Sequence, residues 1–247
     1  MSLAGGAVSV GALVVAAILA ARVFGLFFER RRPYNLMWAV GLLLFACATL
    51  VQAAAEFGGW TDGLFRAWYF FGITNVGFLG LGSVYLANRR AGHAFALFIL
   101  GITAAFGYAV AVTPTNAAVF LAWTAQGLPP TGAGWAASLP RILTPIINIL
   151  GAFPLIGLAL YGLVRFHLRY NAYIAAGAII LAVSTALTRF GVASLLYGGL
   201  LLGVVLMFIG FEKAVEWAKE HRARSPAGGP PPTEEDLATP SVETAPK

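Results

Sequence analysis

Residues 3–35 read LAGGAVSVGALVVAAILAARVFGLFFERRRPYN, an apolar run that ends in Glu29 and three consecutive arginines. The run exceeds the roughly 20 residues that a helix needs to cross the hydrocarbon core of a bilayer. Arg22 is its one internal charge, and a long side chain near the end of a membrane helix can extend to the interface. The stretch therefore predicts a membrane-spanning helix followed by a positively charged turn.

The same pattern recurs along the chain of 247 residues, of which 59% are hydrophobic and 11% are charged, with a mean hydropathy of +0.80. This balance lies far from that of a soluble domain. We therefore predict an all-α, polytopic protein with seven transmembrane helices. The predicted spans, of which the sixth is rather short, are residues 3–28, 36–55, 67–87, 94–112, 142–164, 172–188 and 190–211.

The charged residues between the spans predict the orientation. Basic residues gather in the first, third and fifth connections and after the last span, whereas the other side has fewer of them and also carries acids. The positive-inside rule then places the N-terminus outside and the C-terminus in the cytoplasm, and it accounts for the net charge of +6 without nucleic acid. The cytoplasmic set is Arg30, Arg31, Arg32, Arg89, Arg90, Arg165, Arg169, Lys213, Lys219, Arg222 and Arg224, and the outer set is Arg66, Arg141, Arg189, Glu56 and Asp62.

The composition also predicts the location and the division of the chain. A sequence rich in Ala, Gly and Arg but poor in Lys is typical of bacteria, so we expect the bacterial cytoplasmic (inner) membrane. The expected parts are a transmembrane domain over 1–211, a cytoplasmic helix extension over 212–224 and a disordered cytoplasmic tail over 225–247. The tail is rich in Pro, Thr and acidic residues, which cannot bury a core.

A faint internal repeat links the second and sixth spans, both of which follow basic turns. Tyr-Asn opens each span, and a glycine and a threonine follow at the same spacings: Tyr34, Asn35, Gly41 and Thr49, then Tyr170, Asn171, Gly177 and Thr185. This indicates a parallel 3+1+3 arrangement, as found in transporter folds. The alternative is that small residues and asparagine N-caps recur by local preference in any set of membrane helices.

The long connection over 113–141 is predicted to lie outside. Residues 116–126 have the character of a short helix, which the Gly- and Pro-rich stretch 127–132 ends. Trp123 and Trp135 fit the aromatic belt at a membrane interface. The connection can serve as a lid over an outward-facing cavity or as a lipid-facing cover.

Polar residues within apolar spans are the best clue to a site, because each must find a partner away from lipid. They gather toward the predicted outer leaflet and can form an outward-facing pocket, with Arg141 and Arg189 as counter-charges for Glu56. The alternative is a closed structural network that bridges helices. The candidate ligand-binding residues are Gln52, Glu56, Trp68, Asn75, Arg141, Asn148, Thr185 and Arg189.

Catalytic and cofactor signatures are absent from the sequence, so we expect neither an enzyme nor a metal or other cofactor. His93, His167 and His221 lie at helix ends or in the charged tail, and Cys47 is the single cysteine. The last span contains no lysine that can bind retinal, because Lys213 lies beyond its end. No serine stands in a nucleophile-elbow sequence.

Four short stretches carry a resemblance: Arg-Arg-Pro-Tyr-Asn at 31–35, residues 64–69, residues 195–197 and residues 207–211. They resemble bacterial seven-helix membrane proteins of uncharacterised function and the seven-helix sensor regions of bacterial histidine kinases. The resemblance covers the spans and implies no established functional residues. A kinase module is missing, which argues against direct signalling.

Two functions remain open from the sequence. The first is a protein that binds an unknown small molecule in the outer pocket, as a transporter or a receptor-like sensor. The second is a non-catalytic structural or accessory subunit of a larger membrane complex. The expected partners are the lipid bilayer and, for the second function, another membrane protein or further copies of the chain, with no nucleic acid in either case.

Overall fold

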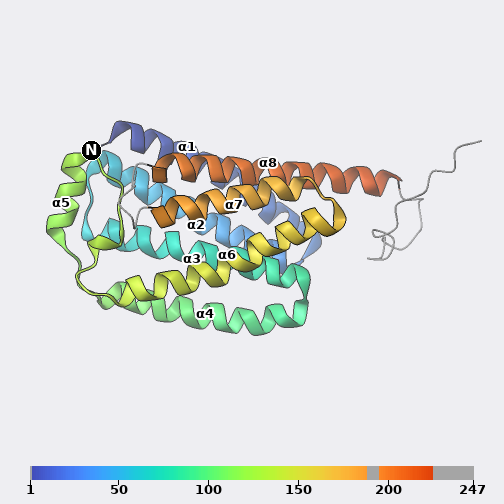
Figure 1. The fold of residues 1–247 in the computed structure, drawn as a ribbon, viewed down its shortest axis with the longest axis horizontal. Coiled ribbons are helices and arrows are strands. Elements are labelled where there is room, and N and C mark those ends of the chain that lie inside the picture. The colour runs from blue at the N-terminus through green and yellow to red at the C-terminus, as the bar shows by residue number, and fades with distance from the viewer. Residues whose placement is uncertain (1, 188–194, 225–247) are drawn as a thin grey trace, which may run out of the picture.

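The computed structural model describes residues 2–187 and 195–224, and within them the chain is all-α (Figure 1). Seven of the helices in this part of the chain are long and apolar enough to cross a membrane, which confirms the predicted polytopic membrane architecture. The helices are α1 (Leu3–Arg30), α2 (Pro33–Gly58), α3 (Asp62–Ala87), α4 (Arg89–Val112), α5 (Ala117–Gln126), α6 (Leu139–Phe166), α7 (Tyr170–Leu187) and α8 (Leu195–Arg224), with the 3₁₀ turn η1 (Gly132–Gly134) before α6.

Local chemistry explains where several helices begin. α2 starts three residues before its predicted span because Pro33 suits the first position of a helix. α3 starts five residues early because the Thr61 side chain accepts a hydrogen bond from the Leu64 amide at 3.3 Å. The Asn88 side chain caps α4 in the same way.

Some predictions fall partly or wholly outside the described residues. The end of the sixth predicted span and the start of the seventh lie there, together with Arg189 and the tail 225–247. The described part of α8 continues through residue 224, beyond the predicted membrane boundary at Phe211. The orientation in the membrane and the division into domains stay predictions.

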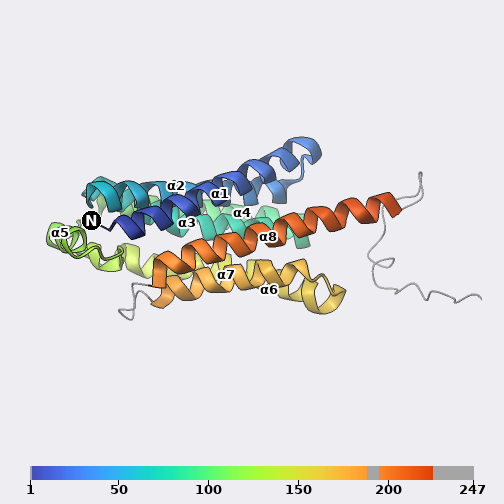
Figure 2. The same ribbon diagram turned by 90° about the horizontal axis from the view of Figure 1, so that it is seen from above.

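Six of the membrane helices form a closed ring in the order α1, α2, α3, α6, α7 and α8. Each helix packs on the next, and α8 packs back on α1 (Figures 1 and 2). α4 lies outside the ring against α3, with a smaller contact to α6. The ring order differs from the chain order only where α4 and α5 are passed over, so the ring contains two consecutive three-helix units, α1–α3 and α6–α8.

The two ends of the bundle differ in composition. One end, called the α5 end below, holds the N-terminus, α5 and η1 (Figure 1). The other, called the arginine end, holds the turns between α1 and α2, α3 and α4, and α6 and α7, which carry the basic clusters predicted to be cytoplasmic. Both α1 and α6 stop at a left-handed residue at this end, Arg31 with φ 51° and His167 with φ 53°.

The two units meet most closely where α3 crosses α6. A methyl group on Gly80 would lie 2.3 Å from the Gly151 carbonyl oxygen, and one on Gly151 would lie 2.2 Å from the Val76 carbonyl oxygen. These distances leave no room for a side chain on either glycine. The two backbones are therefore in direct contact, as small residues allow between membrane helices.

An aromatic cluster closes the α5 end. Phe65 on α3 is fully buried, and its ring contacts those of Phe120, Trp123 and Trp135 at centroid distances of 5.1, 5.7 and 4.9 Å. The expectation that Trp123 and Trp135 face a membrane interface is wrong, because they are only 6% and 2% exposed and pack inward. Contacts with the aromatic rings that the connection brings together are more favourable for these two tryptophans than a position at the membrane interface.

Arg66 contacts both the helix bundle and the connection over residues 113–138. Its side chain donates to the carbonyl oxygens of Val110 and Ala111 at the end of α4, and its Nε donates to Asp62 at 2.8 Å. Its guanidinium also lies 5.5 Å from the centroid of the Trp135 ring. Because these contacts join α3, α4 and the connection, residues 113–138 are held firmly over the α5 end.

Candidate functional site

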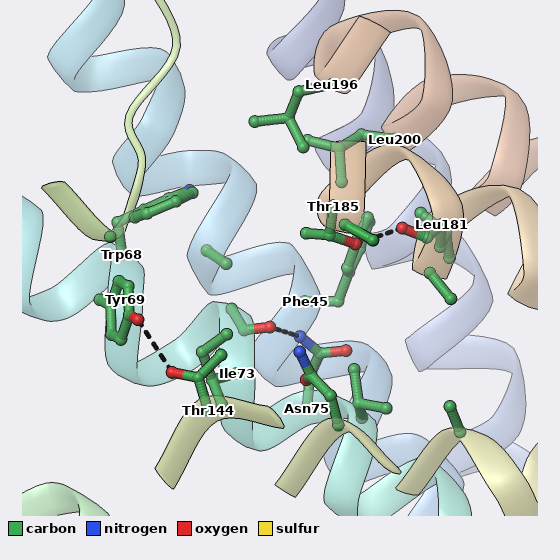
Figure 3. Close-up of a pocket in the computed structure, with 18 of the residues that line it drawn as sticks. Phe45, Trp68, Tyr69, Ile73, Asn75, Thr144, Leu181, Thr185, Leu196 and Leu200 are labelled. Carbon is green, nitrogen blue, oxygen red and sulfur yellow. Dashed lines mark hydrogen bonds between the residues drawn. The ribbon is translucent and has the colours of Figure 1, made fainter. Parts of the chain in front are cut away.

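A cavity of about 680 Å³ lies inside the ring (Figure 3). Residues from α2, α3, α6, α7 and α8 line it, and residues 130–133 of the connection border it at the α5 end. The volume is within the range of pockets that hold small organic molecules. Part of the connection therefore borders the cavity, and its role as a lid stays a prediction.

Gln52 and Trp68 provide a polar group on one wall. The indole Nε1 of Trp68 donates to Oε1 of Gln52 at 3.1 Å. An indole nitrogen only donates, so this bond fixes the amide with its oxygen toward Trp68 and its nitrogen turned away. Gln52 is 0% exposed, and its Nε2 has no hydrogen-bond partner within the described part of the chain.

Tyr69 and Thr144 link α3 to α6 beside the cavity (Figure 3). Their hydroxyl oxygens lie 2.8 Å apart, and Thr144 donates to the Pro140 carbonyl oxygen at 2.8 Å. Because Thr144 uses its proton in that bond, Tyr69 is the donor in the first. Pro145 follows and has no amide N–H, which leaves the Arg141 carbonyl oxygen without its helical partner.

Arg141 is the one charged residue among the described residues that line the cavity. Its side chain is exposed and extends past Gly132, where an added methyl would lie 3.4 Å from its Cγ and Cδ and 3.6 Å from the Tyr69 oxygen. The ion pairs found in the described residues are Arg22 with Glu212 and Arg66 with Asp62, so Arg141 has no carboxylate partner there. Within the described residues, its positive charge is therefore not paired with a carboxylate.

The remaining polar lining is partly satisfied by the helices themselves. Asn75 donates through Nδ2 to the carbonyl oxygens of Phe71 at 3.2 Å and Gly72 at 2.6 Å, and Thr185 donates to the Leu181 carbonyl oxygen (Figure 3). Asn148 differs, because its buried Oδ1 has no partner in the described part of the chain. Two amide groups on the cavity wall, those of Gln52 and Asn148, thus retain unused hydrogen-bonding capacity.

The wall toward the middle of the bundle is apolar. Figure 3 shows Phe45, Leu181 and Leu200 around this part of the cavity, and further apolar residues come from α3, α6 and α8. Leu79, Leu155 and Met207 belong to one buried hydrophobic cluster. The cavity therefore has its one charged residue, Arg141, at the α5 end and a cluster of apolar side chains deeper in the ring.

Six of the eight candidate residues line this cavity: Gln52, Trp68, Asn75, Arg141, Asn148 and Thr185. Glu56 does not. It is 3% exposed, and it accepts a hydrogen bond from the Tyr197 hydroxyl on α8. The expected pairing of Glu56 with Arg141 is not found, because that carboxylate points to the contact with α8. Arg189, its other expected partner, lies outside the described residues.

Sequence reasoning missed the partner of Glu56 and the link between α3 and α6. A tyrosine in an apolar span, such as Tyr197, is a signal in principle, because a buried phenol needs a hydrogen-bond partner. Thr144 gave no such signal, since a threonine in a membrane helix can bond its own backbone. The sequence also gave no indication of the apolar part of the cavity, because its residues have the same types as core residues.

The fold and the cavity define a polytopic integral membrane protein with a central cavity. None of the protein families, curated proteins or solved structures compared with this chain matches it. The resemblance to bacterial seven-helix proteins therefore extends to the seven apolar helices and not to an identified family.

Proposed function

We propose that this protein binds a small molecule in the cavity inside its helix ring and acts as a transporter or a receptor-like sensor. The observation that carries the proposal is the unused polar capacity of the cavity wall. Gln52 is fully buried with an unpartnered amide nitrogen, and Arg141 has no carboxylate partner within the described residues. Buried polar groups are normally satisfied, so the Gln52 nitrogen marks a position that a ligand can complete. Arg141 is exposed and adds a positive charge at the border of the cavity.

The absence of acids, histidines and cysteines among the described lining residues supports a non-catalytic role. Most catalysis by side chains relies on such groups as acids, bases, nucleophiles or metal ligands. The cavity wall offers hydrogen bonds, one positive charge and apolar surface. These are means of binding, so we propose that the molecule leaves the site chemically unchanged.

We also propose that α1–α3 and α6–α8 are parallel repeats around this cavity, and matching helix crossings support this. A methyl on Gly41 would lie 2.8 Å from Leu79, and one on Gly177 would lie 2.8 Å from Met207. Gly82 faces Trp38 in the first unit, and Gly210 faces Ile174 in the second. Gly41 and Trp38 on α2 are separated along the chain from Gly177 and Ile174 on α7 by the same number of residues. Leu79 and Gly82 on α3 are likewise separated by one constant number from Met207 and Gly210 on α8.

The repeat favours transport over sensing, since repeated units around a central site allow one unit to move against the other. It predicts that alanine at Gly41 and alanine at Gly177 both destabilise the protein by similar amounts. Each added methyl meets a leucine or methionine side chain at 2.8 Å and a backbone carbonyl oxygen, that of Asn75 at 3.0 Å or that of Gly203 at 2.6 Å. Thermal unfolding of the two variants measures this. A large cost for one and none for the other would contradict the equivalence of the units.

Native mass spectrometry of the full chain, extracted gently from its own membrane, tests ligand binding. Ala182→Trp fills the cavity from α7, whereas Val183→Trp is its matched control, because Val183 is half exposed and does not line the cavity. We expect a retained small molecule in the wild type and in Val183→Trp, and its loss in Ala182→Trp. If Ala182→Trp retains the molecule as well as the wild type does, the molecule binds elsewhere and the proposal fails.

The accessory-subunit function has one feature in its favour, the position of α4 outside the ring. Leu97 and Tyr108 on α4 are 76% and 69% exposed, and Gly101 has open space around it. A partner helix can pack closely against such a small residue. A protein partner or a second copy in the mass spectrum, without a small molecule, is the result that this function predicts.

A further inference from the structure

Four polar residues of the cavity wall, Gln52, Trp68, Tyr69 and Arg141, lie toward the α5 end, whereas Asn75 and Asn148 lie deeper. Gly132 lies against both the side chain of Arg141 and the hydroxyl group of Tyr69. Tyr69 and Trp68 are neighbours on α3 with ring centroids 6.0 Å apart, and Trp68 holds Gln52. Arg141 and Gln52 are thus connected through Gly132, Tyr69 and Trp68, and these five residues are called the polar group below.

In this group, the side-chain atoms of Arg141 and Gln52 that lack a partner among the described residues are donors, whereas the unpartnered acceptor Oδ1 of Asn148 lies about two turns further along α6. Arg141 is a permanent cation with five N–H donors and no acceptor. The Gln52 amide oxygen is held by Trp68, so the hydrogen-bonding group of Gln52 that stays unused is its buried nitrogen, a donor. A group of donors beside one unpaired positive charge is complementary to oxygen atoms that carry one negative charge. A carboxylate has this chemistry, and the planar guanidinium binds its two oxygens side by side.

The rest of the cavity is complementary to an apolar body. From Arg141 to Leu155, both on α6 and both lining the cavity, the helix rises about 21 Å at about 1.5 Å per residue. Leu155, Leu79 and Met207 lie together in a buried hydrophobic cluster deeper in the ring. The space is therefore elongated, with its charge at the α5 end and apolar side chains beyond.

We infer that the ligand is an amphipathic organic monocarboxylate, with its carboxylate at Arg141 and Gln52 and its apolar body along the deeper wall. This inference rests on the proposed ligand-binding function and names the chemical class of the ligand. The carboxylate provides most of the selectivity. An apolar chain gains little when it moves from lipid into an apolar cavity, because both surroundings exclude water.

The test measures the affinity of the full chain in phosphatidylcholine nanodiscs for three probes with the same ten-carbon chain: decanoate, decanol and decyltrimethylammonium. We expect decanoate to bind at least about tenfold more tightly than the other two, which corresponds to about 1.4 kcal/mol. Arg141→Gln is expected to abolish this preference, and Arg141→Lys to keep part of it, because lysine retains the charge without the planar fork.

Arg90→Gln is the matched control, because Arg90 is an exposed arginine at the arginine end and far from the cavity. It is expected to leave the affinity for decanoate within about twofold of the wild type. Arg141 is itself exposed and forms no ion pair with the described residues, so its replacement is expected to preserve folding, which the thermal midpoint checks. Gln52→Leu is a second variant that removes the amide donor, and with it the acceptor of Trp68, while it keeps the charge; it is expected to weaken the binding of decanoate.

The outcomes separate this inference from the proposed function. If decanol or decyltrimethylammonium binds as tightly as decanoate and Ala182→Trp removes that binding, the cavity binds ligands but the carboxylate inference is overturned. If Ala182→Trp changes the affinity for none of the three probes, both proposals fail. A fourth probe, phenylpropionate, is a water-soluble monocarboxylate, and it shows whether the ligand reaches the cavity from water or from the membrane. Binding of both acids indicates a ligand from water, and binding of decanoate alone indicates one from the membrane.

Discussion

The contact between α3 and α6 yields a sharp prediction about stability. Gly80→Ala places a methyl group 2.3 Å from the Gly151 carbonyl oxygen, whereas ordinary contact needs about 3.4 Å. Both groups are attached to backbone, so no side chain can turn aside, and the helices must separate by about 1 Å. Overpacking of this kind costs about 1–3 kcal/mol, and a domain of this size loses about 2–4 °C for each kcal/mol.

We therefore expect Gly80→Ala to lower the thermal midpoint of the purified protein by several degrees, measured by loss of the folded peak in size-exclusion chromatography. Gly157→Ala is the control, because Gly157 lies on α6 with nothing near it. Alanine is the better helix former by up to about 1 kcal/mol, so the control is expected to be neutral or slightly stabilising. Equal midpoints for the two variants would refute a backbone contact between α3 and α6.

Three other predictions test separate features. Tyr197→Phe is expected to cost about 1–3 kcal/mol, because it leaves the buried Glu56 carboxylate with Trp60 as its side-chain donor and without the tyrosine; a thermal double-mutant cycle with Glu56→Leu, which removes the acceptor, measures the coupling, and additive effects would contradict it. Arg66→Gln is expected to cost about 1–2 kcal/mol through lost bonds to the carbonyl oxygens at the end of α4, whereas Arg90→Gln changes the midpoint little. After replacement of the native cysteine, Ala136→Cys is expected to react with an impermeant maleimide in intact cells and Arg90→Cys only after lysis; the reverse result inverts the predicted orientation.

The membrane helices were predictable because length and hydropathy are local properties of the chain. The starts of α2 and α3 were missed by a few residues, because Pro33 and Thr61 act through helix-end geometry that a hydropathy window does not measure. The inward packing of Trp135 could not be predicted in the same way. It depends on aromatic rings on α3, α5 and the connection, which meet only in the folded chain.

The candidate site was predictable in its residue types and not in its pairings. Gln52 and Arg141 stood out as polar groups near apolar spans, and both line the cavity. Glu56 stood out for the same reason but bonds to Tyr197 instead. Sequence spacing identifies residues on one face of one helix, whereas the partner on another helix depends on how the ring closes.

The crossing of Gly80 and Gly151 also restricts how the ring can change shape. Two backbones in contact cannot approach further or slide past each other without collision, but they can rotate about the point where they touch. The opposite join of the ring, between α1 and α8, is made through side chains such as Leu201 against Gly11, which can yield. We therefore expect that a widening of the cavity rotates one half of the ring about the α3–α6 crossing and changes mainly the contact between α1 and α8.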